Sequence, residues 1–343
     1  VGQGAIRIAV MGFQPGPASS EQLEEMKRLT EEEFRQGVFG ITTGLLYPPG
    51  VFTPLEEIAE LAKYGGYYGT HQRGESEILV ESVISESIRV GEMADVPVHI
   101  HHLEAFGPRH FWKIPFILKT IEEAREIKGV DVTFDLFPYA AANTTILAIF
   151  PPWALEGGVS ALIERLKNPE LKAMMLKEIE TTVESPRGWP HNLVKQVGWE
   201  NVLVLWCASE KNKQYEGKTL AEIGELMGTT PFEAACKLTI EEKGAIMCLY
   251  FGCSGTREED WNSEGIKTLL IDMDSQAHES LNFGIKDCES SVYNLLTLDP
   301  TKKKNLEQII INYNKRLDII PSNILLSTLE QELADEIGRE SRL

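Results

Sequence analysis

The sequence has 343 residues, of which 43% are hydrophobic and 25% are charged, so it can bury the core of one large barrel or of two ordinary domains. Its formal net charge of -19 disfavours nucleic acid or an anionic membrane as a partner, because both attract clustered lysine and arginine. The five cysteines are odd in number and form no CxxC pair, which favours a reducing cytoplasmic setting over a disulfide framework or a thiolate zinc site.

Strand-like and helical patterns alternate along the first part of the chain. Runs rich in β-branched and aromatic residues cover 5–12, 38–45, 66–72, 96–103 and 130–137, and amphipathic helical segments cover 20–37, 54–66, 75–94 and 116–129. Strand, helix, strand at this spacing favours parallel pairing, because a parallel neighbour requires a long crossover. The sequence therefore predicts an α/β fold with a parallel sheet.

The most apolar stretch follows at residues 144–155, but it is too short to cross a bilayer and it contains two prolines. The N-terminus has no signal pattern of basic and then apolar residues, so we expect neither a membrane segment nor an export signal. The sequence starts at Val1, directly in strand-like residues, from which we expect that the natural chain is longer. Nothing in the composition indicates the oligomeric state.

The alternation stops after this stretch. Residues 155–240 are mostly helical in pattern, with one strand-like run at 201–207, which predicts a helical insertion. Strand-like runs return at 245–252 and 268–274 and suggest that residues 241–290 hold the last strands of the sheet. Residues 291–343 have the charge and apolar pattern of a helical C-terminal segment.

Polar residues at strand ends are the candidates for chemistry, because the active site of a parallel α/β barrel lies where its strands end. They are His71, with Arg73 and Glu75 after it; the cluster His99, His101 and His102; Asp135 and Tyr139; and Asp272 and Asp274. Two histidines and a carboxylate could bind Zn²⁺ and leave a position for water, which indicates a hydrolase. Spacing alone leaves other roles open, since such a histidine is often structural and such an aspartate often caps a helix.

The sequence motifs around these residues are more specific than the spacing of the residues. The segments AIRIAVMGF, FGITTGLLYPPG, YYGTHQRGE, VPVHIHHLEAFG, DVTFDLFPYAA and YEGKTLAEIGELMGTTPFEAACKL resemble, in this order, the D-aminoacylase (N-acyl-D-amino-acid deacylase) family of the amidohydrolase superfamily. The resemblance covers about residues 1–275. It implies a (β/α)₈ TIM barrel that lacks its first strands here, with residues 1–154 carrying the histidine motifs, and a zinc-dependent hydrolase that removes the acyl group from N-acyl-D-amino acids.

The resemblance also implies a role for each residue of this sequence that matches a functional position of the family. The resemblance implies that His71 and His102 bind zinc, and that Asp274 is both a metal ligand and the general base, with Asp272 as its competitor. His101 then stands where the family commonly has serine. Because alternate strand residues face opposite sides, this selection predicts that His102, and not His101, points toward His71. Substrate contacts would come from Tyr47, Tyr139 and Arg73, although Arg73 could instead pair with Glu75.

Several positions depart from the family pattern. The first-strand HxH pair and the metal-bridging cysteine would lie before Val1, and Gln3 stands where histidine is usual. Glu104 replaces a lysine and would repel a substrate carboxylate if it faced the pocket. The alternative hypothesis is therefore a catalytically inactive or truncated protein that keeps the amidohydrolase scaffold without a complete metal site.

Overall fold

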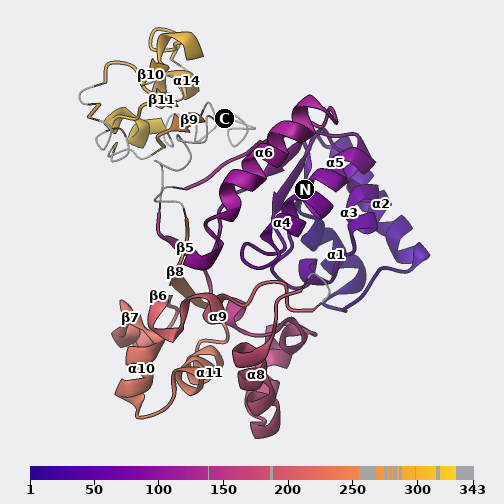
Figure 1. Ribbon diagram of the computed structural model, residues 1–343, viewed down its shortest axis with the longest axis vertical. Coiled ribbons are helices and arrows are strands. Elements are labelled where there is room, and N and C mark those ends of the chain that lie inside the picture. The colour runs from indigo at the N-terminus through magenta and orange to yellow at the C-terminus, as the bar shows by residue number, and fades with distance from the viewer. Residues whose placement is uncertain are drawn as a thin grey trace. The chain divides into compact units, whose positions relative to one another are not determined.

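The computed structural model describes residues 1–137, 139–185, 188–254, 268–273, 277, 280, 284–285, 288–297, 299–313 and 317–329. The chain forms two compact units, Val1–Arg257 and Glu258–Leu343. Figure 1 shows the elements of the first unit from indigo to orange-brown and those of the second in orange to yellow. In the described residues, no helix is long and apolar enough to cross a membrane.

The first unit contains a parallel sheet of four strands in the order β1-β2-β3-β4. The strands are β1 (Ile41–Gly44), β2 (Tyr68–His71), β3 (Val98–Ile100) and β4 (Val132–Phe134). Helix α2 (Ser20–Arg35) precedes β1, and the helices between the strands are α3 (Leu55–Ala62), α4 (Leu79–Glu81), the π-helical stretch η2 (Ser82–Ile88), α5 (Arg89–Ala94) and α6 (Lys113–Glu126). The predicted strand and helix order therefore holds from residue 20 to residue 137.

The two faces of this sheet differ in what covers them. Val98 and Ile100 are fully buried, and a Cβ on Gly91 of α5 would lie 2.5 Å from Val98, so this face packs closely against the helices. The opposite face carries His99, which is half-buried, and Thr133, which is exposed. Their side chains are hydrogen-bonded to each other. The structure therefore confirms the α/β class, but the described strands do not close into a barrel.

The strand predicted at 5–12 is wrong. Residues Gln3–Met11 form helix α1, and Gln3, Arg7 and Met11 on its buried face recur every fourth residue, which is a helical period. Arg7 Nη1 lies 2.6 Å from both carboxylate oxygens of Glu57 on α3, and this buried ion pair joins the two helices. The pairing with β1 comes just before the helix, where Gly2 forms a parallel bridge with Thr42.

The rest of this unit contains a second sheet, which is antiparallel, and the helices around it. Its sheet has the order β5-β8-β6-β7, with β5 (Ala141–Thr145), β6 (Val202–Cys207), β7 (Lys218–Thr219) and β8 (Ile246–Phe251). Its helices are α7 (Val159–Leu166), α8 (Pro169–Thr181), α9 (Leu193–Val197), α10 (Leu220–Met227) and α11 (Pro231–Glu241).

The expected last barrel strands within 241–290 are therefore placed differently. Alternate residues of β8 are buried, with Cys248 and Tyr250 fully covered, as suits an antiparallel sheet with one buried face. The other expected strand, β9 (Thr268–Ile271), belongs to the second unit.

The second unit has its own sheet and core. The sheet order is β10-β11-β9, in which β11 (Leu317–Ile320) pairs parallel with β9 and antiparallel with β10 (Ile311–Asn312). Its core contains Val292, Tyr293 and Leu296 of α14 (Val292–Leu296) together with Ile309, Ile320, Leu326 and Leu329. The segment expected to be helical over 291–343 thus contains two strands, because β11 finds a partner in β9 and β10 finds one in β11.

Candidate metal centre

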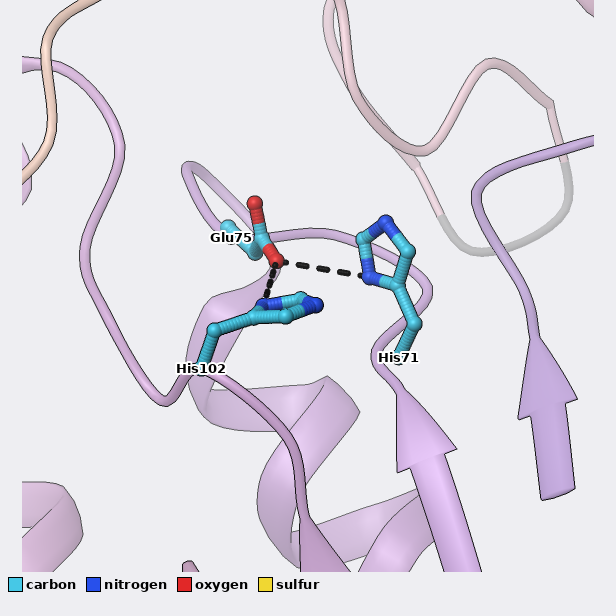
Figure 2. A group of neighbouring side chains, drawn as sticks. All are labelled: His71, Glu75 and His102. Carbon is cyan, nitrogen blue, oxygen red and sulfur yellow. Dashed lines mark ion pairs between the residues drawn. The ribbon is translucent and has the colours of Figure 1, made fainter. Parts of the chain in front are cut away.

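Two of the predicted zinc ligands meet at the carboxyl ends of neighbouring strands. His71 ends β2, and His102 lies just after β3, with the two imidazole centroids 4.5 Å apart. A third side chain, Glu75, reaches the same point from the loop after β2, and Figure 2 shows both rings directed at its carboxylate. Glu75 Oε1 lies 3.4 Å from His71 Nδ1 and 3.2 Å from His102 Nδ1.

The prediction that His102 points toward His71 is confirmed, but strand alternation is not the reason. His102 lies beyond the last residue of β3 and has a φ of 39°, a left-handed conformation that interrupts the alternation. Two contacts from the end of β4 hold it there: Asp135 Oδ1 accepts the amide of His102, and the carbonyl of Asp135 accepts the amide of Leu103 at 2.7 Å. His101 instead pairs with Asp135.

The ligand atoms of this cluster have no hydrogen-bond partner outside it. His71 Nδ1, His102 Nδ1 and Glu75 Oε1 are all buried, lie within 4.8 Å of one another and face only each other. Such convergent, unsatisfied atoms are costly unless a cation lies among them. Two ligand atoms about 2.0–2.1 Å from a tetrahedral Zn²⁺ are about 3.3 Å apart, and the distances from Glu75 to the two histidines match this separation. The residues present therefore fit a zinc ion.

Tyr47 holds His71 in the orientation that zinc binding requires. Its hydroxyl lies 3.3 Å from His71 Nε2 and 2.6 Å from Thr144 Oγ1. A histidine that binds a metal through one nitrogen usually donates its other N–H to a neighbouring acceptor. With Nε2–H directed at Tyr47, the lone pair of Nδ1 faces Glu75. The predicted substrate contact of Tyr47 is thus accompanied by a contact to a candidate ligand.

The electrostatics of the cluster favour a positive charge at its centre. Burial lowers the pKa of His71 to about 4, which keeps this imidazole neutral and able to ligate near neutral pH. Burial also opposes charge on His102, but the Glu75 carboxylate outweighs it and raises the pKa of His102 to about 9. In return, His102 and His71 lower the pKa of Glu75 despite its burial. A metal ion would replace the proton on His102.

The sequence assigned no metal-binding role to Glu75 or to a second residue near it, His191. Glu75 stands in the HQRGE motif, among the polar residues after a strand, and the role suggested for it was to pair with Arg73. His191 is fully buried against Phe106, its two ring nitrogens have no hydrogen-bond partner, and its Nδ1 lies 4.0 Å from Glu75 Oε2. It comes from a loop within the expected helical insertion, where no strand pattern marks it, so only folding brings it near Glu75.

The Arg73 side chain is bonded to other residues of the fold and not to the cluster of His71, Glu75 and His102. Its guanidinium donates to Glu86 at 2.6–3.1 Å and to the carbonyls of Val51 and Thr53 at 2.7 and 2.8 Å. The alternative pairing with Glu75 is therefore wrong, because the buried partner is Glu86, and the substrate contact of Arg73 stays a prediction. The side chain is 6% exposed, so its donors are used inside the fold.

The structure describes the surroundings of other residues that the sequence singled out. Tyr139 is 61% exposed and its ring stacks on Phe137, and its substrate contact stays a prediction. Glu104 is buried, and burial together with the charge of Glu75 raises its pKa, so it does not present the repulsive carboxylate that the sequence suggested. Asp274 lies outside the described residues, and its competitor Asp272 accepts hydrogen bonds from Ser280 within the second unit.

Two cavities adjoin the cluster. One, of about 500 Å³, is lined by Thr42, Thr43, His71, His101, His102, Asp135, Leu136 and Phe137. The other, of about 300 Å³, is mainly apolar, and its lining includes Phe13, Leu46, Tyr47, Leu147, Phe150 and Trp189. Tyr47 borders this apolar cavity and also contacts His71. The fold and the site together describe an α/β protein with a candidate metal centre at the carboxyl ends of its parallel strands.

Known proteins identify the relationship more closely. The D-aminoacylase of Alcaligenes xylosoxydans xylosoxydans is 37% identical over 150 residues, which are 43% of this chain and 30% of that enzyme. A crystal structure of D-aminoacylase shares the fold, with a TM-score of 0.54 and 23% identity over 79% of this chain and 46% of that one. The chain is thus related to the D-aminoacylase (N-acyl-D-amino-acid deacylase) group of amidohydrolases and spans about a third of the length of the curated relative.

The C-terminal part has a different relationship. Residues 259–343 match the protein family described as AAA domain. An uncharacterised protein of Methanocaldococcus jannaschii is 37% identical over 86 residues, which are 23% of this chain and 32% of that protein. The printed sequence contains no GxxxxGK[ST] phosphate-binding motif. The run TLLIDMDS, expected to be a barrel strand with the catalytic aspartate, falls inside this matched segment.

Proposed function

We propose that the first unit carries the zinc site of a metal-dependent amide hydrolase that removes the acyl group from N-acyl-D-amino acids. The observation that carries the proposal is the convergence of His71 Nδ1, His102 Nδ1 and Glu75 Oε1 without hydrogen-bond partners outside the cluster. They lie at the carboxyl ends of parallel strands, in a chain related to D-aminoacylases.

His71, His102 and Glu75 would hold the ion. When bound, zinc would polarise a water molecule and the acyl carbonyl. The protein's own contribution is to keep His71 neutral by burial, to orient it through Tyr47, and to fix His102 through Asp135. The apolar cavity beside Tyr47 suits an apolar part of the substrate. Asp274 has no part in this proposal, because it falls within the segment that matches the AAA domain.

The test combines zinc content with amine release from N-acetyl-D-methionine and its L enantiomer. We expect one zinc ion to be lost in Glu75→Gln and retained in the control Glu77→Gln. Glu77 lies two residues after Glu75, and its exposed side chain pairs with Arg109. Hydrolysis of the D enantiomer that disappears in Glu75→Gln would support the proposal. Folded protein that binds no zinc through Glu75 would refute it.

A second candidate is a scaffold that keeps the metal centre without hydrolysis. The observation that favours it is the open parallel sheet, because the four described strands leave one face of the sheet partly uncovered. Zinc bound through Glu75 with no amine release from either enantiomer would select this candidate over the hydrolase.

A further inference from the structure

A second group of metal-ligating side chains lies on the open face of the parallel sheet. Asp135 Oδ2 is 2.9 Å from His99 Nε2 and 3.1 Å from His101 Nδ1. The two imidazole centroids are 4.8 Å apart, so both rings approach the same carboxylate oxygen. These side chains are 29–51% exposed, and an ion in solution can reach them. They use none of the ligand atoms of His71, Glu75 and His102.

Thr133 and Asp135 hold the His99 ring from its two nitrogens. His99 Nδ1 lies 2.7 Å from the Thr133 hydroxyl, which also lies 3.4 Å from the carbonyl of Val98, and His99 Nε2 lies 2.9 Å from Asp135 Oδ2. A metal ion bound at Nε2 would leave the contact between Nδ1 and Thr133 in place, and such a contact orients a metal-binding histidine.

The backbone around the cluster positions the other two ligands. Gly69 leaves room for the His101 ring, since a Cβ at this position would lie 2.9 Å from His101 Nε2. Asp135 is held because its second oxygen, Oδ1, accepts the amide of His102. One carboxylate therefore uses Oδ1 to fix a ligand of the first cluster and presents Oδ2 to His99 and His101.

We propose that His99, His101 and Asp135 form a second binding site for a divalent transition-metal ion, distinct from the cluster of His71, Glu75 and His102. Two imidazole nitrogens and one carboxylate oxygen are a donor set that suits Zn²⁺, Ni²⁺ or Co²⁺ rather than Mg²⁺ or Ca²⁺. Solvent would complete the coordination, because the site is open. The inference does not depend on hydrolysis.

Zinc stoichiometry of the full chain, measured by equilibrium dialysis with elemental analysis, tests the proposal. We expect two zinc ions per chain, one in His101→Ser, one in Glu75→Gln and none in the double variant. Thr133→Val leaves all three ligands in place but no longer fixes His99, and we expect it to weaken binding at the second site about 10- to 100-fold. Asp131→Asn, an exposed aspartate earlier on the same segment, is the control and should keep both ions.

The variants also separate this site from the first. Zinc that binds to Glu75→Gln and is lost on adding His101→Ser would establish the second site even if the first binds nothing. Folded Glu75→Gln protein without zinc, or His101→Ser protein with undiminished zinc, would overturn the proposal and leave the cluster as a hydrogen-bonded histidine–aspartate network. Circular dichroism of each variant shows that the comparison is made on folded protein.

Discussion

Replacing Arg73 by methionine should destabilise the first unit strongly. The substitution removes the forked contact with Glu86 and the donors to the carbonyls of Val51 and Thr53 while keeping an apolar stem of similar length. Removing one partner of a buried ion pair costs about 3–5 kcal/mol, because the remaining charge is left unpaired. We therefore expect Arg73→Met to lower the free energy of unfolding by about 3–5 kcal/mol.

A double substitution identifies the source of this cost. Arg73→Met/Glu86→Gln removes the unpaired charge but leaves the two carbonyls without their donors, each worth about 1–3 kcal/mol when buried. The double variant should therefore recover part, but not all, of the lost stability. Arg89→Met on α5 is the control, because Arg89 is 54% exposed and pairs with Glu92, and such surface pairs contribute about 0–1 kcal/mol.

Urea unfolding followed by tryptophan fluorescence measures these differences. Five of the six tryptophans lie before residue 258, so the signal reports mainly on the first unit. A loss below about 1 kcal/mol in Arg73→Met would refute the buried ion pair as a stabilising contact. A variant with unchanged stability but a raised KM for an N-acyl-D-amino acid would instead restore the substrate role that the sequence suggested for Arg73.

Three further predictions concern single side chains. Tyr47→Phe should weaken zinc binding at the first cluster about 10- to 100-fold, measured by competition with a chelator, since His71 loses its hydrogen-bond partner; unchanged affinity would contradict this. Hydrogen bonds from Ser209 lower the pKa of Glu242 despite its burial, so the stabilisation that the ionised Glu242 gives the fold is present above the unfolded pKa and is lost in acid. The difference in unfolding free energy between wild type and Glu242→Gln should therefore shrink below about pH 4.5. A difference that stays constant with pH would refute this prediction. In native protein at pH 8, a thiol reagent should modify Cys288 first, which peptide mapping by mass spectrometry would show. The reason is that burial raises the pKa of Cys207 to about 11 and the pKa of Cys236 and Cys248 to about 12. Labelling of any of these three before Cys288 would contradict the prediction.

Much of the first sheet and one pair of candidate ligands could be predicted from the sequence. The alternation of strand and helix patterns placed β1 to β4 correctly, because each crossover segment carries a helical period of its own. The similarity of VPVHIHHLE to a family motif selected His102 over His101, and the structure brings His102 to His71. The other two histidines of that cluster, His99 and His101, meet around Asp135.

Other assignments failed because local pattern does not determine partners. The run at 5–12 has strand-like composition, yet it forms a helix whose Arg7 is buried against Glu57, fifty residues away in the sequence. Residues 268–274 resembled a last barrel strand, but β9 pairs with β11 of the second unit. A short apolar run carries no information about which strand it will join.

The sequence by itself determined the α/β class, the order of the first four strands and the histidines at their ends, because these depend on residue periodicity and on short motifs. Only the tertiary structure decided which carboxylate joins each pair of histidines. Glu75 pairs with His71 and His102 while Arg73 is engaged with Glu86, and Asp135 presents one oxygen to His99 and His101 while its other oxygen accepts the amide of His102. Side-chain partners that lie tens of residues apart depend on packing and on the competition for hydrogen bonds, which sequence spacing does not record.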